Sequence, residues 1–192
     1  MASCNSSMNA IASGFVNQHF SPPIFQATIN SDMEQLQLRD QVIRFDKDRT
    51  RRAYSSMKGG DAERCGCSYC RNFATQRSTA YPEVFRSLLD QLGIDAEKEG
   101  EVYESGPEGS LRMYGGWLYF AGEFVRAGER MSDTGSGFQY WFADAKNLPK
   151  PEADFGPIVL AVEFWTRLPW VIPDQPYSTL SRSPDRPSTT AA

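Results

Sequence analysis

The chain has 192 residues, of which 40% are apolar and 12% aromatic, and its formal net charge at pH 7 is −4. This length fits one domain with unstructured ends better than two independent cores. The apolar content excludes a wholly disordered protein, and the negative charge argues against a general binder of polyanions.

The charge is unevenly distributed along the chain. Residues 39–77 contain ten Lys/Arg and five Asp/Glu, whereas the remaining residues contain ten basic and nineteen acidic side chains. A basic segment on an acidic protein forms either solvated helix faces, which is the commoner case, or a patch that binds anions.

Hydropathy indicates the compartment. No apolar run approaches the roughly 20 residues that a membrane helix needs, and the N-terminus lacks the basic and apolar regions of a secretory signal. We therefore expect a cytoplasmic protein without membrane association. Because thiols stay reduced there, clustered cysteines favour metal binding or redox chemistry over structural disulfides.

Residues 1–30 are rich in Ser, Asn, Ala and Gln and show no sustained period, so we predict a flexible extension. This segment contains Cys4 and His19, the only histidine of the chain. Beyond it, Leu36 and Leu38 suggest a short amphipathic turn or helix at 32–38.

Two further helices are predicted before the strands begin. The first spans 46–57, where Asp46 or Asp48 can cap the start and a Gly-Gly pair follows the end. The second follows Pro82 and carries one apolar stripe at helical spacing, with Gly93 placed as a left-handed cap. Its stripe consists of Phe85, Leu88, Leu89 and Leu92.

Strand patterns dominate the second half. They occupy 101–104, 111–114, 117–125, 138–142 and 158–165, and Gly115-Gly116 is expected to form a hairpin turn or a bulge. Helices followed by successive strands predict an α+β fold. We expect a single domain over 31–172, with an antiparallel sheet of four to five strands packed with two or three helices, and a disordered tail over 173–192.

Three of the four cysteines fall within six positions, as Cys65, Cys67 and Cys70. A two-residue spacing lets a tight turn direct two sulfurs at one ion, and thiolates suit tetrahedral zinc. A closed structural site needs a fourth ligand. The candidates are Cys4 and His19 from the extension, Asp61 or Glu63, or water.

Other chemistry is open to the same cysteines. Two close thiols can cycle through a disulfide, and Arg64 and Arg71 would favour thiolates. An iron–sulfur cluster normally uses four cysteinates, so it ranks below zinc. The residues could also be ordinary reduced thiols in a turn that packs Tyr69 and Phe73 into the core.

The remaining motifs do not indicate a particular enzyme activity, so the question of catalysis stays open and a non-enzymatic role is favoured. No glycine-rich segment matches a phosphate-binding loop, and a catalytic Cys–His pair would have to recruit His19 from the extension. Glu123 and Glu163 each interrupt an apolar strand, but solvated strand faces explain most such carboxylates. The aromatic residues of the strands could stack on a flat ligand, although core packing is commoner.

Part of the chain resembles an uncharacterised bacterial protein family with no assigned activity. The resemblance rests on the Cys-x-Cys-x-Tyr-Cys-Arg-Asn-Phe motif at 65–73, with Leu92-Gly93-Ile94-Asp95, Gly100-Glu101-Val102-Tyr103-Glu104 and Tyr114-Gly115-Gly116-Trp117. It covers a little under half of the chain. It implies that the cysteines, the helix after them and the first strands form one unit.

Three hypotheses of function follow. The first is a zinc-binding α+β module, with a binding or regulatory role, that uses Cys65, Cys67 and Cys70. The second is a thiol redox protein or sensor that uses the same cysteines. The third is nucleic-acid contact by residues 39–77; a protein partner is compatible with the first, and its identity is unknown.

Overall fold

The structure is a computed structural model that describes residues 33–129 and 131–173. The predicted extension at 1–30 and all of the predicted tail except Pro173 lie outside the described residues. The elements follow in the order β1 (Glu34–Leu38), β2 (Gln41–Phe45), α1 (Lys47–Ser56), α2 (Asp61–Cys65), α3 (Ser68–Ala80), α4 (Glu83–Leu92), β3 (Glu101–Glu108), β4 (Leu111–Arg126), β5 (Ser132–Asp133), β6 (Gln139–Asp144), the 3₁₀ turn η1 (Ala145–Asn147) and β7 (Val159–Pro169).

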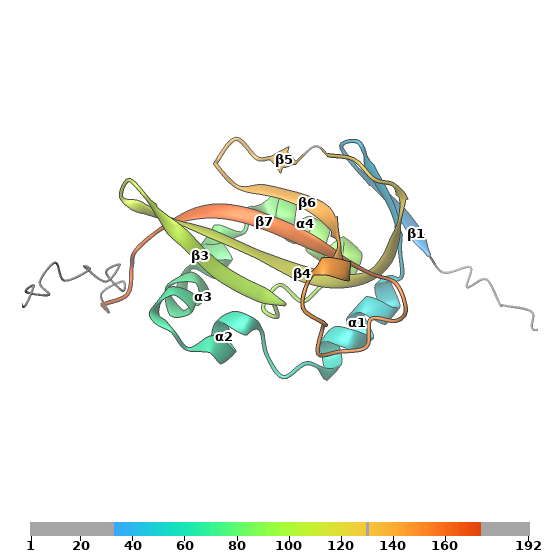
Figure 1. The fold of residues 1–192 in the computed structure, drawn as a ribbon, viewed down its shortest axis with the longest axis horizontal. Coiled ribbons are helices and arrows are strands. Elements are labelled where there is room, and N and C mark those ends of the chain that lie inside the picture. The colour runs from blue at the N-terminus through green and yellow to red at the C-terminus, as the bar shows by residue number, and fades with distance from the viewer. Residues whose placement is uncertain (1–32, 130, 174–192) are drawn as a thin grey trace, which may run out of the picture. The chain divides into compact units, whose positions relative to one another are not determined.

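The described strands form one antiparallel sheet in the order β1-β2-β4-β7-β6-β5, with β3 paired to β4 (Figure 1). The α+β arrangement is confirmed, and α1, α3 and α4 match the prediction of two or three helices. The expected strand number of four to five was wrong, because the sheet has seven strands. The additional strands are short: β1 and β2 have five residues each, and β5 has two.

Strand β1 replaces the short helix or turn predicted at 32–38. Leu36 and Leu38 alternate with polar residues, which is the period of a half-buried strand. The strand conformation is stabilised by pairing with β2, which places Leu36 opposite Ile43. The sequence pattern of 32–38 alone does not show this pairing. Tertiary pairing therefore decided between two readings of a short pattern.

Strand β4 runs without interruption through Gly115 and Gly116, so the turn or bulge predicted there was wrong. A Cβ on Gly115 would lie 2.7 Å from the Tyr103 hydroxyl, and a Cβ on Gly116 would lie 2.8 Å from the ring of Phe164. Both glycines serve close approach of an aromatic ring inside a strand. They do not mark a change of chain direction.

Helix α1 completes one edge of β4. The first part of this edge pairs with β3 and the last part with β2, and Figure 1 shows β4 passing from one to the other. Between them, the Ala121 carbonyl accepts from the N–H of Asp46, and the Ala121 N–H donates to Thr50 Oγ1. The Tyr54 hydroxyl donates to the Tyr119 carbonyl at 2.9 Å. These contacts satisfy backbone groups that no strand reaches.

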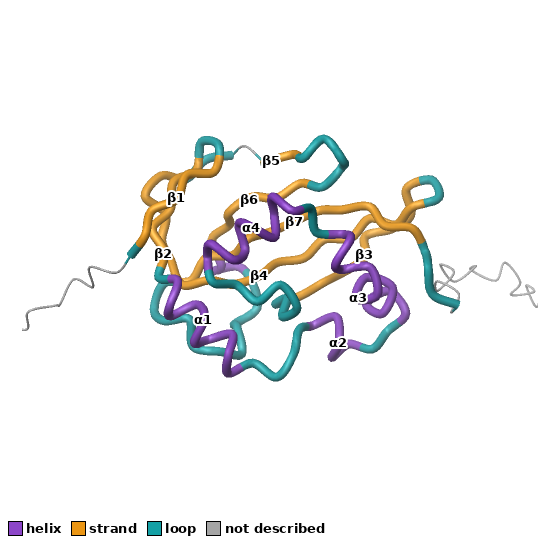
Figure 2. Tube along the Cα trace, turned by 180° about the vertical axis from the view of Figure 1, so that it is seen from behind, coloured by secondary structure: helices purple, strands orange, loops and turns teal. Residues whose placement is uncertain are grey.

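Helices α3 and α4 cover one face of the sheet, which we call the inner face (Figure 2). The predicted stripe of α4 is buried there, and Gly93 ends this helix with a φ of 77°, as expected. The core between these helices and the inner face is an aromatic cluster, in which Phe164 stacks on Phe138 at 5.9 Å between ring centroids. The cluster consists of Phe73, Tyr81, Phe85, Tyr114, Phe138, Tyr140 and Phe164. None of the described helices is long and apolar enough to cross a bilayer.

Candidate metal centre

The three predicted cysteines lie where two helices meet. Cys65 is the last residue of α2, and Gly66 ends that helix in the left-handed conformation, with a φ of 66°. Cys67 is the N-cap of α3, and Cys70 lies in the first turn of that helix. The sequence predicted a turn but not α3, whose apolar stripe is weak because its buried residues include Asn72 and Arg77.

The sulfur atoms converge. The three Sγ atoms all lie within 4.8 Å of one another, and all three residues are free thiols. Zn–S bonds of about 2.3 Å in tetrahedral geometry place two sulfurs about 3.8 Å apart, so small side-chain rotations suffice to bind one ion. Cys70 is buried, Cys67 is half-buried and Cys65 is exposed. The cluster therefore contacts the core through Cys70 and is accessible to solvent at Cys65.

The surroundings at the start of α3 shift the pKa values of Cys67 and Cys70 in opposite directions. Burial would raise the pKa of Cys67, but the N–H of Cys70 and the neighbouring thiols outweigh it, so this pKa lies below its ordinary value. Burial raises the pKa of Cys70 strongly, and the thiols of Cys65 and Cys67 add to the effect. Metal binding at Cys70 must therefore displace a firmly held proton.

The cluster is attached to the edge of the sheet. Cys70 Sγ lies 3.9 Å from the Val102 carbonyl oxygen in β3, and Asp61 Oδ2 accepts from the Val102 N–H at 3.1 Å. The Asp61 N–H in turn donates to the Glu99 carbonyl. Helices α2 and α3 thus cover backbone groups of β3 while they position the three sulfurs.

The carboxylates considered as fourth ligands are engaged elsewhere. Asp61 accepts from Val102, and Glu63 Oε1 pairs with Arg77 Nη2 at 2.6 Å. Among the described residues, the group of close ligand atoms consists of the three sulfurs only. Cys4 and His19, the remaining candidates from the protein, lie outside the described residues.

A buried ion pair that the sequence did not reveal joins α3 to the segment before β3. Arg77 donates to both carboxylate oxygens of Glu99, with Nε–Oε1 at 2.5 Å and Nη2–Oε2 at 3.0 Å. Glu99 is fully buried, and the Tyr81 hydroxyl also donates to it. Burial raises the pKa of Glu99, and the charge of Arg77 only partly opposes this. No motif signals this pair, because its two residues are 22 positions apart.

Three arginines of the basic segment at 39–77 form ion pairs with acidic side chains. Arg44 pairs with Glu123, Arg64 with Glu152, and Arg77 with Glu99. Its residues are distributed over the β1–β2 hairpin, α1, α2 and α3. Nucleic-acid contact by this segment stays a prediction.

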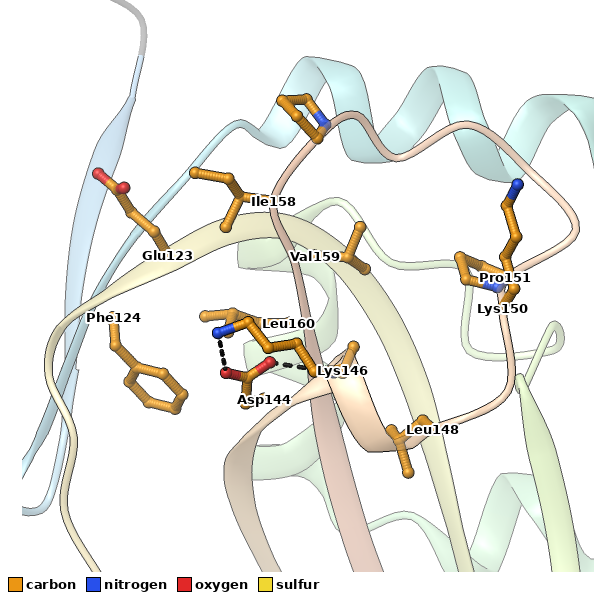
Figure 3. A pocket seen from close by; sticks show the side chains of 12 residues that line it. Glu123, Phe124, Asp144, Lys146, Leu148, Lys150, Pro151, Ile158, Val159 and Leu160 are labelled. Carbon is orange, nitrogen blue, oxygen red and sulfur yellow. Dashed lines mark hydrogen bonds and ion pairs between the residues drawn. The ribbon is translucent and has the colours of Figure 1, made fainter.

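A cavity of about 590 Å³ lies away from the cysteines, beside β4, η1 and the start of β7 (Figure 3). Phe124, Leu148 and Ile158 give it apolar walls. Three of its four charged side chains form ion pairs, since Lys146 Nζ lies 2.9 Å from Asp144 Oδ2 and Glu123 pairs with Arg44. The fourth is Lys150. Nothing in the lining selects a particular ligand.

Comparisons with protein families, with curated proteins and with solved structures find no match to this chain. The three converging sulfurs are therefore the feature from which a function is argued.

Proposed function

We propose that Cys65, Cys67 and Cys70 bind one zinc ion and that the chain works as a binding or regulatory module built around this centre. The observation that carries the proposal is the convergence of three free sulfurs within 4.8 Å. Soft thiolate ligands select zinc over magnesium or calcium, which prefer oxygen. Three cysteinates also fall short of the four that iron–sulfur clusters normally use.

The ion would connect the two helices to the sheet. Cys65 belongs to α2 and Cys70 to α3, and both helices contact Val102 in β3. A ligand that binds only the folded state stabilises it by about 2.7 kcal/mol when its free concentration is 100 times its Kd. Zinc would thus hold the start of α3 in place, and a fourth ligand would come from water, a partner, or Cys4 or His19.

The test is metal content together with stability. We expect protein purified without chelator to contain about one zinc per chain by elemental analysis, and chelation to lower the free energy of unfolding by about 2–3 kcal/mol. Cys67→Ser should lose the metal and the sensitivity to chelator. Cys4→Ser and His19→Ala, measured in parallel, show whether the N-terminal segment supplies the fourth ligand.

Ser68→Ala is the matched control, because it changes the residue next to Cys67 without removing a sulfur. It should retain zinc at the wild-type stoichiometry. Metal-free wild-type protein that takes up no zinc when the ion is added would refute the proposal. Equal metal content in wild type and Cys67→Ser would do so as well.

Thiol redox chemistry is the second candidate, favoured by the exposure of Cys65 beside two further thiols. With a hydroperoxide as oxidant, the Cys67 thiolate would attack the terminal peroxide oxygen, which forms an S–O bond and breaks the O–O bond. The sulfur becomes a sulfenic acid, and the other oxygen leaves as an alkoxide, or as hydroxide from hydrogen peroxide, and takes up a proton. The Cys65 thiol would then attack that sulfur, form a disulfide and release water. Mass spectrometry after mild peroxide treatment checks this: a reversible loss of two mass units is expected, and three unchanged thiols would exclude it.

The resemblance of residues 65–73 and the segments after them to a bacterial family is consistent with this proposal. It implies that the cysteines and β3 form one unit, and the contacts of Asp61 and Cys70 with Val102 support that view.

A further inference from the structure

The face of the sheet opposite α3 and α4 carries a second unusual group of side chains. The strand register places four residues in one row across β3, β4, β7 and β6, namely Glu101, Trp117, Glu163 and Trp141. The next row contains Tyr103, Gly115, Trp165 and Gln139. Residues that are directly opposite in an antiparallel sheet share a face. We call the set Glu101, Tyr103, Trp117, Trp141, Glu163 and Trp165 the outer aromatic face.

Gly115 explains how the rings form a continuous surface. Any Cβ at this position would lie 2.7 Å from the phenol of Tyr103, so glycine lets the Tyr103 ring lie over the strand. The ring then contacts Trp165 edge-on at 5.7 Å and Trp117 at 6.2 Å between centroids. Tyr103 is 36% exposed and Trp165 is half-buried, so solvent reaches the edges of this packed layer.

One end of this sheet face is covered and the other is not. The loop after η1 lies over Tyr119, whose hydroxyl donates to the Pro149 carbonyl, and Phe155 packs against the same ring. Along β7, the exposure rises from fully buried Ala161 to half-buried Glu163 and Trp165. This loop leaves the outer aromatic face partly accessible: Trp117 is buried, whereas the other five residues of the face are half-buried or exposed.

The two carboxylates of this face have no cationic partner among residues 33–129 and 131–173. In the described part of the chain, no Lys or Arg forms an ion pair with Glu101 or Glu163. Burial raises the pKa of Glu163, and the indole N–H of Trp141, which lies opposite Glu163 in the register, only partly offsets this. Burial and the charge of Asp61 raise the pKa of Glu101. Burial also raises the pKa of Tyr103, and the charges of Glu163 and Glu101 add to this effect.

Glu123 provides the contrast within the same sheet. Like Glu163, it interrupts an apolar strand, but its Oε1 lies 2.5 Å from Arg44 Nη2. The fold therefore supplies a cation to one glutamate and leaves the other as a half-buried anion among aromatic rings. A desolvated anion of this kind is costly unless a positive group compensates it.

We propose that the outer aromatic face binds a guanidinium group, presented as an arginine side chain by a peptide or protein partner. A guanidinium is planar and weakly hydrated, stacks on aromatic rings and donates two parallel hydrogen bonds to a carboxylate. A lysine ammonium is more strongly hydrated and offers no fork. A neutral flat ligand would desolvate the carboxylates further without neutralising them. This proposal is independent of the metal centre.

The test uses a blocked pentapeptide with one central arginine. Three of the four tryptophans of the chain belong to the face, so their fluorescence reports binding. We expect a saturable change at low salt with half-saturation at about 1 mM. The matched peptide with citrulline, which has the same shape without the charge, should not bind, and the lysine peptide should bind several-fold more weakly.

Two glutamate variants locate the contact. Glu163→Gln should weaken the arginine peptide about tenfold, whereas Glu123→Gln changes the net charge equally and should leave the affinity unchanged. Because glutamine keeps an acceptor for the Trp141 N–H, we expect the variant to fold, and circular dichroism checks this. Trp141→Phe, which removes the donor and shortens the ring system, should also weaken binding.

Each alternative result overturns the proposal. Equal binding of arginine and citrulline peptides would mean stacking without charge recognition. Equal loss in Glu123→Gln and Glu163→Gln would mean a net-charge effect. Equal affinity for the lysine peptide, or no saturable change up to about 10 mM of the arginine peptide, would exclude a guanidinium site.

Discussion

The candidate metal centre and the outer aromatic face both use β3, but they are assembled in opposite ways. The centre takes its sulfurs from residues 65–70, where one left-handed glycine joins two helices. The face takes its residues from 101–165, and only the register of four strands aligns them. A site that is local in the chain depends on turn geometry. A site that is spread over a sheet depends on every strand keeping its register.

Because the two sites are assembled differently, we expect them to respond differently to substitutions. Loss of a single sulfur should abolish the proposed metal centre. The outer aromatic face should tolerate substitutions at its exposed edge, and it should lose its binding surface when the core beneath it rearranges. The Arg77–Glu99 pair lies between the two regions, because Arg77 belongs to α3 and Glu99 precedes β3 by two residues. Substitutions in these regions therefore distinguish dependence on local turn geometry from dependence on strand register.

The largest effect is expected in β7, where neighbouring aromatic residues face opposite sides of the sheet. Phe164 is 1% exposed and contacts four rings of the inner cluster, so Phe164→Ala should cost about 3–5 kcal/mol of unfolding free energy. Trp165→Ala, on the outer face, should cost about 1 kcal/mol. Urea denaturation compares the two. Equal losses would contradict the assignment of inner and outer faces.

Breaking the buried ion pair should have the next largest effect. Arg77→Met removes the cation that pairs with the fully buried Glu99, which should cost about 3 kcal/mol at neutral pH. The control is the double variant Arg77→Met/Glu99→Gln, which carries no buried charge, keeps an acceptor for Tyr81 and should be less destabilised than the single variant. A double variant that is no more stable would show that packing, not charge, dominates at this joint.

The same variant has a pH dependence whose sign follows from Glu99. Its pKa in the folded protein is raised by burial, and the loss of Arg77 would raise it further. A raised carboxyl pKa means that the protonated form favours folding, so stability is gained as pH falls through that pKa. The cost of Arg77→Met should therefore shrink towards acidic pH. A cost that is constant between neutral and acidic pH would contradict a charged Glu99.

The smallest effect concerns Ser68, whose hydroxyl is buried and has no hydrogen-bond partner among the described residues. Because no bond is lost when this hydroxyl is removed, Ser68→Ala should change the unfolding free energy by less than about 0.5 kcal/mol or stabilise the protein slightly. Thermal melting measures this. A loss of more than about 1 kcal/mol would show that the hydroxyl has a partner after all, such as a thiolate of the neighbouring cysteines.

The amino-acid sequence by itself determined the local features of this protein. The spacing of Cys65, Cys67 and Cys70 indicated convergent thiols, and the structure brings their sulfurs together. The apolar stripe of α4 and its Gly93 cap were readable for the same reason, since each depends on neighbours within a few residues.

Only the tertiary structure decided what distant residues do to one another. Gly115-Gly116 resembles a turn until the rings of Tyr103 and Phe164 are seen to require the space. Glu123 and Glu163 look alike in the sequence, yet strand pairing brings Arg44 to the first and tryptophans to the second. Arg77 and Glu99 show no pattern at all. Such contacts depend on which strands and helices become neighbours, and the local periodicity of the sequence does not determine this.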